Sequence, residues 1–584
     1  MLDSSLTAYR RLLLRYLRPL WPGLLLLALL LVANVGLQLL NPWIAKSFID
    51  GAQAGVPVEA LTATAIEFLA VALLIQGVSV AEGYVAENVG WLATNALRAD
   101  LTEHCLELDL GFHQTHQPGE LIERVDGDVS ALSNFFASFV VEIVGNGVLL
   151  VGILTLLFRV DWRLGLLLTA VCVVAGGWMT ATSGIGTRFV GLRRGASAEV
   201  FAALEEQLGG LADIQGNGAQ SYMLNRWQSQ LRSLVERASK STLIGGAVTS
   251  PGLLVLGIGS IAVFGLAALL HQAGIVSLGT VFLAFQYTAL LQAPLDRLTR
   301  QVRDLQTAAA SIQRIAWLTT TPRTIADGHG VELPAGPLAV EFRDVSFGYD
   351  ETSRALRDVT FRLPAGRVLG VVGRTGSGKS TLMRLAARLY DPTEGEVRLG
   401  GEGALWALRD TRLADLRRHV GVVTQDVQLF RASVRDNVTL FDPSLDDARI
   451  QSALHDLGLG DWFRALPRGL DTELAPNSVS AGEAQLLAFT RVFLQDPGLV
   501  VLDEASSRLD LATERAIEHA VQRLFVGRTV IVIAHRLETL RQADDIMVLA
   551  DGQIVEYGRR DWLVADETSR FAQLLQAGSA EALV

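Results

Sequence analysis

The chain has 584 residues, which exceeds the size of one ordinary domain, so at least two domains are expected. Half of the residues are hydrophobic and 19% are charged, and the long apolar runs lie mostly before about residue 300. The formal net charge of −11 argues against a nucleic-acid-binding protein, because neutralising phosphates requires clustered Lys and Arg.

Six apolar stretches in the first half have the roughly 20 residues that a helix needs to cross a bilayer. They are predicted at about 20–41, 60–81, 135–158, 162–182, 247–270 and 276–295. Glu67 and Gln76 interrupt the second stretch. The few polar helices of this chain could not cover six such stretches in a soluble core, so the sequence predicts a membrane domain with six spans.

Basic residues predict how these spans are oriented. Arg10, Arg11, Arg15 and Arg18 precede the first span, which places the N-terminus in the cytoplasm. The segment 184–246 is also rich in Arg and is predicted to be cytoplasmic. An even number of spans then returns the second half of the chain to the cytoplasm. The segments 86–134 and 184–246 show apolar residues at helical spacing, so the spans are expected to continue as long cytoplasmic helices.

A complete phosphate-binding loop opens the second half. The strand-like segment 368–372 precedes it and the helix-like segment 382–387 follows it, which is the context that this motif requires. Glycines let backbone N–H groups surround phosphates, the Lys adds a positive charge, and the Ser hydroxyl can bind Mg²⁺. The predicted ATP-binding residues here are Gly373, Arg374, Thr375, Gly376, Ser377, Gly378, Lys379, Ser380 and Thr381.

Two further strand ends carry residues suited to hydrolysis of a bound nucleotide. An apolar strand over 499–502 leads into Asp503 and Glu504, which are predicted to hold Mg²⁺ and to act as the general base, respectively. Another buried strand ends at His535, which could contact the γ-phosphate. Together with Lys379, Glu504 and His535 form the predicted catalytic set.

With these motifs in place, the chain resembles an exporter-type ATP-binding cassette (ABC) half-transporter over nearly its whole length. The resemblance implies that Tyr349 stacks on adenine and that Gln425 is the Q-loop glutamine, which joins Ser380 and Asp503 at Mg²⁺. It also implies that Asp510 belongs to the D-loop. Phe112-His113, Pro118–Ile122 and Asp126–Val129 resemble the first cytoplasmic coupling region of the family.

The family signature, usually Leu-Ser-Gly-Gly-Gln, is altered in this chain. It is represented by Val479 followed by Ser480, Ala481, Gly482 and Glu483. The resemblance implies that these residues contact ATP bound to a second copy. Glu483 replaces an amide with a carboxylate, whose charge is less favourable near a triphosphate. Serine with glutamate occurs within the family, so a working variant is expected.

These observations predict an α-helical membrane domain with six transmembrane helices and long cytoplasmic extensions, joined to an α/β P-loop ATPase domain. The expected boundaries are 1–315 for the membrane domain, 316–338 for a linker and 339–584 for the nucleotide-binding domain. The expected function is ATP-driven export, or outward flipping, of a hydrophobic or amphipathic substrate, with ATP and Mg²⁺ as cofactors. The expected location is the cell membrane. The chain is expected to cross this membrane several times and to contact its lipids, with the nucleotide-binding domain in the cytoplasm.

Alternatives differ in how firmly the sequence opposes them. A soluble cassette ATPase lacks the upstream spans, a regulatory channel has no need of Glu504, and an importer does not fuse its domains in this order. If the signature must meet the phosphate loop of another copy, as the resemblance implies, one cassette cannot complete an ATP site. The expected partner is therefore a second half-transporter; a homodimer is favoured and a heterodimer stays open. The substrate is not identified. Polar residues at membrane depth either pack helices or face a cavity: Glu67, Glu142, Asn146, Gln286 and Tyr287.

Overall fold

The computed structural model describes residues 15–350, 353–475, 478–503, 511–534 and 539–576. The chain divides into two compact units. The helical unit comprises Met1–Leu106 and Pro118–Thr321, and the α/β unit comprises Glu107–Gln117 and Pro322–Val584. The short segment Glu107–Gln117, which lies in the sequence between two parts of the helical unit, therefore belongs to the α/β unit.

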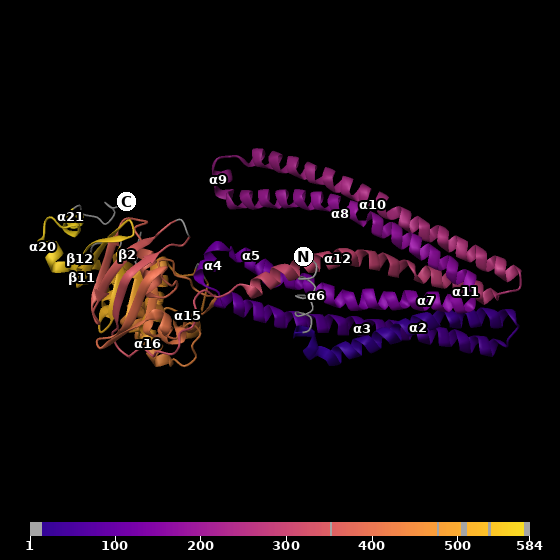
Figure 1. Cartoon of the computed structure of the whole chain (residues 1–584), viewed down its shortest axis with the longest axis horizontal. Coiled ribbons are helices and arrows are strands. Elements are labelled where there is room, and N and C mark those ends of the chain that lie inside the picture. Colours follow the sequence, from indigo (N-terminus) through magenta and orange to yellow (C-terminus); the bar gives the residue numbers. More distant parts are fainter. Residues whose placement is uncertain (1–14, 351–352, 476–477, 504–510, 535–538, 577–584) are drawn as a thin grey trace. The chain divides into compact units, whose positions relative to one another are not determined.

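The helical unit consists of long helices joined by short connections (Figure 1). The helices α8 and α10 pack against each other and contain 48 and 53 residues. At about 1.5 Å per residue, such helices are far longer than a bilayer core of about 30 Å. The elements are α2 (Trp21–Gln53), α3 (Val58–Glu107), α5 (Pro118–Ile122), η2 (Glu123–Asp128), α6 (Val129–Ser138), η3 (Phe139–Gly145), α7 (Asn146–Val160), α8 (Trp162–Gly209), α9 (Leu211–Gly216), α10 (Gln220–Gln272), α11 (Leu278–Leu290) and α12 (Gln292–Thr320).

Four helical stretches in the described part of the chain are long and apolar enough to cross a membrane. They are Arg15–Gln53, Val58–Glu107, Glu142–Val160 and Leu254–Gln272. The apolar stretches Trp162–Trp178 and Leu278–Leu290, at the fourth and sixth predicted spans, are shorter. The predicted helical fold of the first half is thus confirmed, and the count of six spans stays a prediction.

The sixth predicted span, 276–295, is interrupted. α11 ends at Leu290 and α12 begins at Gln292. Pro294 has no N–H to donate to the carbonyl of Leu290, which is the bond that a continuous helix would make there. The missing hydrogen bond coincides with the break between α11 and α12.

The α/β unit contains two large sheets. One is antiparallel, with the order β2-β1-β4-β5, and the other has the order β12-β11-β3-β10-β9-β6. In the second sheet the five strands from β11 to β6 are parallel, and β12 is antiparallel to β11. The strands are β1 (Ala339–Phe347), β2 (Leu356–Leu363), β3 (Val368–Gly373), β4 (Glu394–Gly401), β5 (Ala404–Ala407), β6 (Val420–Val423), β9 (Leu499–Asp503), β10 (Thr529–Ile533), β11 (Asp545–Ala550) and β12 (Gln553–Arg559).

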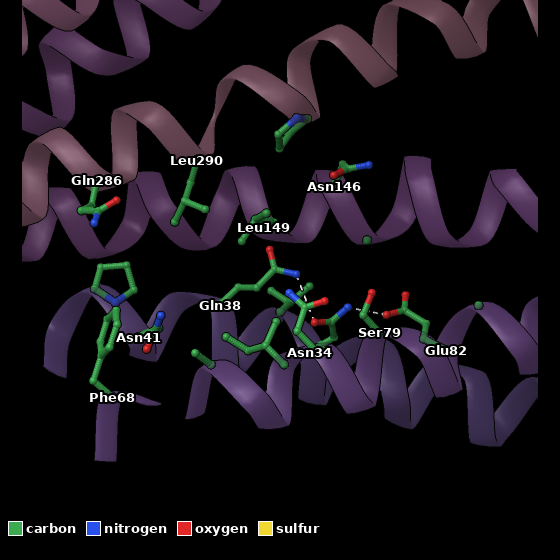
Figure 2. Close-up of a pocket in the computed structure, with 18 residues that line it drawn as sticks. Asn34, Gln38, Asn41, Phe68, Ser79, Glu82, Asn146, Leu149, Gln286 and Leu290 are labelled. Atoms are coloured by element: carbon green, nitrogen blue, oxygen red, sulfur yellow. Dashed lines mark hydrogen bonds between the residues drawn. The ribbon is translucent and has the colours of Figure 1, made fainter. Parts of the chain in front are cut away.

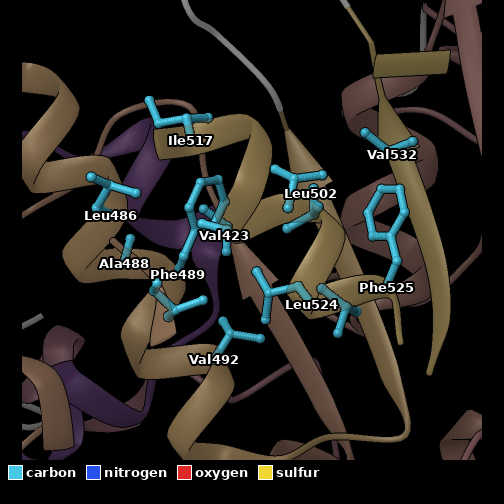
Figure 3. Close-up of a cluster of buried hydrophobic side chains, with 14 of the residues drawn as sticks. Val423, Leu486, Ala488, Phe489, Val492, Leu502, Ile517, Leu524, Phe525 and Val532 are labelled. Atoms are coloured by element: carbon cyan, nitrogen blue, oxygen red, sulfur yellow. The ribbon is translucent and has the colours of Figure 1, made fainter. Parts of the chain in front are cut away.

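The parallel sheet is covered by hydrophobic side chains on both faces, as expected for strands that read as continuous apolar runs. One face packs against α18 (Ala481–Gln495) and α19 (Leu511–Phe525), where Phe489, Val492, Leu502 and Val532 meet (Figure 3). The other face packs against α13 (Lys379–Ala386) through Leu382 and against the antiparallel sheet. Along the parallel strands, alternate side chains point to opposite faces and so belong to two separate hydrophobic clusters.

The remaining elements of the α/β unit connect these layers. They are α4 (Leu110–Thr115), η4 (Leu408–Asp410), α14 (Leu413–His419), β7 (Ala432–Ser433), α15 (Val434–Thr439), α16 (Asp447–Asp456), α17 (Gly460–Arg464), η5 (Gly469–Asp471), β8 (Glu473–Leu474), η6 (Thr539–Gln542), α20 (Arg560–Ala565) and α21 (Arg570–Gln576).

Candidate functional site

The carboxyl ends of the parallel strands bring Asp503 and the start of the phosphate loop to one edge of the sheet. The register aligns Asp503, at the end of β9, with Ile533 of β10, and Ile533 with Val371 of β3. β3 leads directly into the phosphate loop, and β6 ends two residues before Gln425, whose side chain is exposed. Sequence-distant motifs thus converge because their strands run in parallel.

The phosphate loop turns tightly between β3 and α13. Gly378 has φ of 103°, in the left-handed region, and a Cβ at this position would lie 2.7 Å from the carbonyl oxygen of Ala355. Only glycine fits there without a shift of the backbone. The loop delivers the chain to the N-terminus of α13, where free N–H groups favour an anion.

Lys379 lies at the centre of the loop. Its Nζ donates hydrogen bonds to the carbonyl oxygens of Gly373 at 2.7 Å and Arg374 at 3.0 Å. The side chain is buried, and this burial lowers the pKa of Lys379, while the charge of Asp503 opposes the shift. The lysine is held by the loop backbone, in reach of the space that the loop encloses.

Ser380 and Asp503 form the oxygen pair that a divalent cation would need. The Ser380 Oγ donates to Asp503 Oδ2 at 3.3 Å, and Asp503 is buried. Hydroxyl and carboxylate oxygens suit Mg²⁺, which is usually held by one or two protein groups together with phosphates and water. The donor set therefore fits Mg²⁺.

Tyr349 is half-exposed beside the phosphate loop and is held by its hydroxyl group. That group lies 3.1 Å from the Thr381 hydroxyl and accepts a hydrogen bond from Arg384 at 2.8 Å. The Tyr390 ring packs edge-on against the Tyr349 ring, with the centroids 5.3 Å apart. Arg384 and Tyr390 were not among the residues that the motifs pointed to, because neither belongs to a motif of its own.

The signature residues lie at the start of α18. Ser480 Oγ accepts from the Glu483 backbone N–H at 3.3 Å, and the Glu483 carboxylate accepts from the Ser480 N–H at 2.7 Å. Glu483 is therefore turned back onto its own helix as half of a capping box. Ala481 is exposed and Gly482 is buried. The altered residue has a structural partner, which the motif comparison did not anticipate.

Phosphate loop and signature are carried by helices on opposite faces of the parallel sheet. α13 packs into the cluster that includes Leu382, and α18 packs into the cluster that includes Phe489. Glu504, Asp510 and His535 lie outside the described residues.

The segment Glu107–Gln117 is fastened to the chain after Thr321. Asp109 accepts hydrogen bonds from the Thr324 hydroxyl at 2.6 Å, from the Ile325 N–H at 3.3 Å, and from the Thr324 N–H. Glu107 forms an ion pair with Arg323. In α4, a Cβ on Gly111 would lie 3.4 Å from the Tyr390 ring, so the helix backbone runs against that side chain.

A second site lies in the helical unit: a cavity of about 600 Å³ between α2, α3, α7, α11 and α12 (Figure 2). Asn146 and Gln286 line it, as one of the two sequence readings allowed. Glu67 is exposed and does not line the cavity, and the Tyr287 hydroxyl instead donates to the Leu39 carbonyl at 2.8 Å. Glu142 is not a lining residue either; its carbonyl accepts from the Asn146 amide.

Other polar lining residues were missed by the sequence analysis. On α2 they are Asn34, Gln38 and Asn41, which recur at helical spacing inside an apolar stretch and so gave a usable signal. On α3 the cavity is lined by Glu82, one residue beyond the predicted span.

Comparison with known proteins agrees with this architecture. Residues 24–295 match the family model described as the ABC transporter transmembrane region, and residues 356–507 match the model described as ABC transporter. An ATP-dependent lipid A-core flippase of Chromohalobacter salexigens is 31% identical over 586 residues, covering 99% of each chain. The probable multidrug resistance ABC transporter ATP-binding/permease protein YheH of Bacillus subtilis is 30% identical, covering 81% of this chain and 70% of its own.

Among solved structures, that of a bacterial Atm1-family ABC exporter with ATP bound has a similar fold. The TM-score is 0.77 at 24% identity, with 97% of this chain and 98% of that chain covered. At this identity the likeness concerns the fold alone.

Proposed function

We propose that this chain, which belongs to the ABC transporter family, uses ATP to export or flip an amphipathic substrate across a cell membrane. Relatives that match over most of their length are named as a lipid A-core flippase and a probable multidrug resistance transporter. The first name describes the flipping of a lipid, and the second describes a transporter linked to resistance to several drugs. The helical unit, with its cavity, and the phosphate-loop unit supply the two parts that such a transporter requires.

In the proposed ATP site, different residues bind the phosphates, the adenine, the metal ion and the attacking water. Lys379 and the loop from Gly373 to Thr381 bind the phosphates, and Tyr349 stacks on the adenine. Ser380 and Asp503, joined by Gln425, would hold Mg²⁺, which would neutralise charge on the β- and γ-phosphates. Glu504 polarises the attacking water, and His535 contacts the γ-phosphate.

A second copy of the chain completes each ATP site. The observation that carries this step is the placement of α13 and α18 on opposite faces of one sheet. Ser480, Ala481, Gly482 and Glu483 of one chain would then meet ATP bound to the phosphate loop of the other, with Asp510 of the D-loop alongside. We favour a homodimer.

ATP binding would drive closure of this dimer, and hydrolysis would reset it. ATP can shift the equilibrium only by binding the closed state more tightly than the open one. The N-terminus and the nucleotide-binding domain, proposed at 339–584 after a membrane domain at 1–315 and a linker at 316–338, would lie in the cytoplasm, where ATP is available.

The experiment that tests the proposal is ATP hydrolysis by the full chain in lipid vesicles. Glu504→Gln should bind ATP but hydrolyse it at least about a hundredfold more slowly, because it removes the general base. Glu518→Gln, at an exposed position of α19, serves as the matched control and should be unaffected. Hydrolysis by Glu504→Gln at the wild-type rate would contradict the assignment.

A further inference from the structure

The cavity in the helical unit is lined by both polar and apolar side chains. Four carboxamide side chains, one hydroxyl and one carboxyl group come from α2 and α3, and two more carboxamides come from α7 and α11. Apolar side chains such as Phe68, Ile75, Leu149 and Leu290 complete the wall (Figure 2). A lining of this kind suits a molecule with both a polar group and an apolar body.

The α3 lining is one continuous face of the helix. Phe68, Ala72, Ile75, Ser79 and Glu82 line the cavity at intervals of three or four residues. Glu67, on the same helix, lies off this stripe and is exposed. The buried carboxyl group of Glu82 is thus turned inward by the same periodicity that places Phe68 there.

A chain of hydrogen bonds orients the polar groups. Gln38 Nε2 donates to Asn34 Oδ1 at 3.1 Å, and Asn34 Nδ2 donates to Glu82 Oε2 at 2.5 Å. Asn41 Oδ1, also on the cavity wall, is buried and makes no hydrogen bond within the described part of the chain. Since a carboxylate can accept several hydrogen bonds, Glu82 keeps capacity for a donor beyond Asn34.

The charge carried by the cavity lining is negative. Among the 18 lining residues, all in the described part of the chain, Glu82 is acidic and none is Lys, Arg or His. An anionic group, such as a phosphate, would meet the Glu82 carboxylate with no compensating cation. A cationic group would pair with Glu82 and donate to, or lie among, carboxamide oxygens.

We propose that this cavity binds the cationic head group of an amphipathic substrate, with Glu82 as its counter-ion. The carboxamides of Asn34, Gln38 and Asn41 surround the head group, and the wall formed by Phe68 and Leu290 receives the apolar part. The π-helical segment η3 ends at Gly145, where the cavity wall begins, a placement often seen at functional sites. This assignment rests on the proposed export function and names its substrate class.

The test is equilibrium binding to the full chain in detergent, without nucleotide. Radiolabelled tetraphenylphosphonium serves as the cationic probe, and decylammonium and decanoate serve as competitors of equal chain length and opposite charge. We expect saturable binding to the wild type, displacement by decylammonium and not by decanoate, and at least tenfold weaker binding to Glu82→Gln. Glu67→Gln removes a carboxylate from the same helix outside the cavity and should bind as the wild type does.

Two further variants separate charge from folding. Glu82→Asp keeps the carboxylate and should retain more of the binding than Glu82→Gln. At Gly83, a lining residue, an added Cβ meets no atom within 4 Å, so Gly83→Leu should occupy the cavity and weaken binding at least tenfold. Gly77, which has equal room and does not line the cavity, provides the control Gly77→Leu.

Several results would overturn the proposal: unchanged probe affinity in Glu82→Gln, wild-type binding by Gly83→Leu, or decanoate displacing the probe as well as decylammonium does. Failure of the proposed export function would appear in a different measurement, the hydrolysis of ATP in vesicles. A chain that binds the cation but does not hydrolyse ATP in vesicles contradicts the proposed function alone, and one that hydrolyses ATP but does not bind the cation contradicts only the cationic site.

Discussion

Tyr349 illustrates how a single aromatic residue is prepared for a ligand. Its hydroxyl is engaged by Thr381 and Arg384, and Tyr390 packs against its ring at 5.3 Å between centroids. These contacts restrict the ring, so less rotamer freedom would be lost if a base stacks on it, as we propose. Mutations can separate the role of the Tyr349 ring from the role of the hydroxyl contacts that hold it.

Tyr349→Ala removes the surface and should raise the KM for ATP about tenfold to a hundredfold, since base stacking contributes about 1–3 kcal/mol. Tyr349→Trp keeps an aromatic face and should be tolerated. Tyr349→Phe keeps the ring and loses the hydroxyl partners, so it should fall between the wild type and Tyr349→Ala. The measurement is ATPase rate against ATP concentration; equal KM values in all four proteins would show that the base is held elsewhere.

Glu483 shows how an unfavourable charge is accommodated. Its carboxylate accepts from the Ser480 N–H, so it stabilises the start of α18. Glu483→Gln can form the same capping box without the charge, and ATPase activity should be equal to or higher than that of the wild type. Glu483→Ala loses its half of the capping box, the bond from the Ser480 N–H, and should lower the free energy of unfolding by about 0.3–1.5 kcal/mol. Thermal unfolding and ATPase assays check both; a large loss of activity in Glu483→Gln would show that the carboxylate itself is required.

At the scale of elements, α4 links three parts of the α/β unit. Asp109, just before α4, holds Thr324 and Ile325, and the α4 backbone at Gly111 runs against Tyr390, which in turn packs on Tyr349. The connection that leaves the helical unit is therefore tied to the same helix that lies near Tyr349, the ring proposed to stack on adenine. We therefore expect these contacts to transmit the nucleotide-bound state of the ATP site to the connection that leaves the helical unit.

Asp109→Ala removes the acceptor for Thr324 and Ile325. We expect ATP affinity to stay near the wild-type value, while stimulation of ATPase by a transported amphipath falls about twofold to thirtyfold, the range for a coupling change of about 0.5–2 kcal/mol. The stimulated-to-basal ATPase ratio in vesicles is the measurement. Glu103→Gln, an exposed acidic position on α3, is the control. Unchanged stimulation in Asp109→Ala would remove the coupling role from this contact.

At the scale of the whole molecule, the question is whether an ATP site is shared between copies. A mixed dimer carrying Ser480→Arg in one subunit and Lys379→Ala in the other decides it. If sites are shared, both changes fall in the same composite site and one site remains intact. A self-contained site would place one change in each subunit and leave none.

We therefore expect nucleotide trapping at one site of the mixed dimer, measured with differently tagged copies. Ser480→Arg alone should leave ATP binding by the separate chain almost unchanged, because its own phosphate loop is carried on the other face of the sheet. Absence of trapped nucleotide from the mixed dimer would count against the shared site.

The amino-acid sequence by itself determined the parts that depend on contiguous residues. The phosphate loop could be predicted because Gly378, Lys379 and Ser380 are neighbours in the sequence, and the loop is formed by their own backbone and the helix that follows. Long apolar stretches likewise predicted a helical membrane domain, since the bilayer imposes length and composition.

Only the tertiary structure decided which residues share a site. Asn34, Glu82, Asn146 and Gln286 come from four helices, and their meeting depends on how each helix is rotated about its axis by packing against the others. The same packing leaves Glu67 exposed. Its place inside a predicted span had suggested that it lies at the same membrane depth as Asn146 and Gln286. The direction of the Glu483 side chain and the opposite placement of α13 and α18 also follow from long-range contacts, which no short motif encodes.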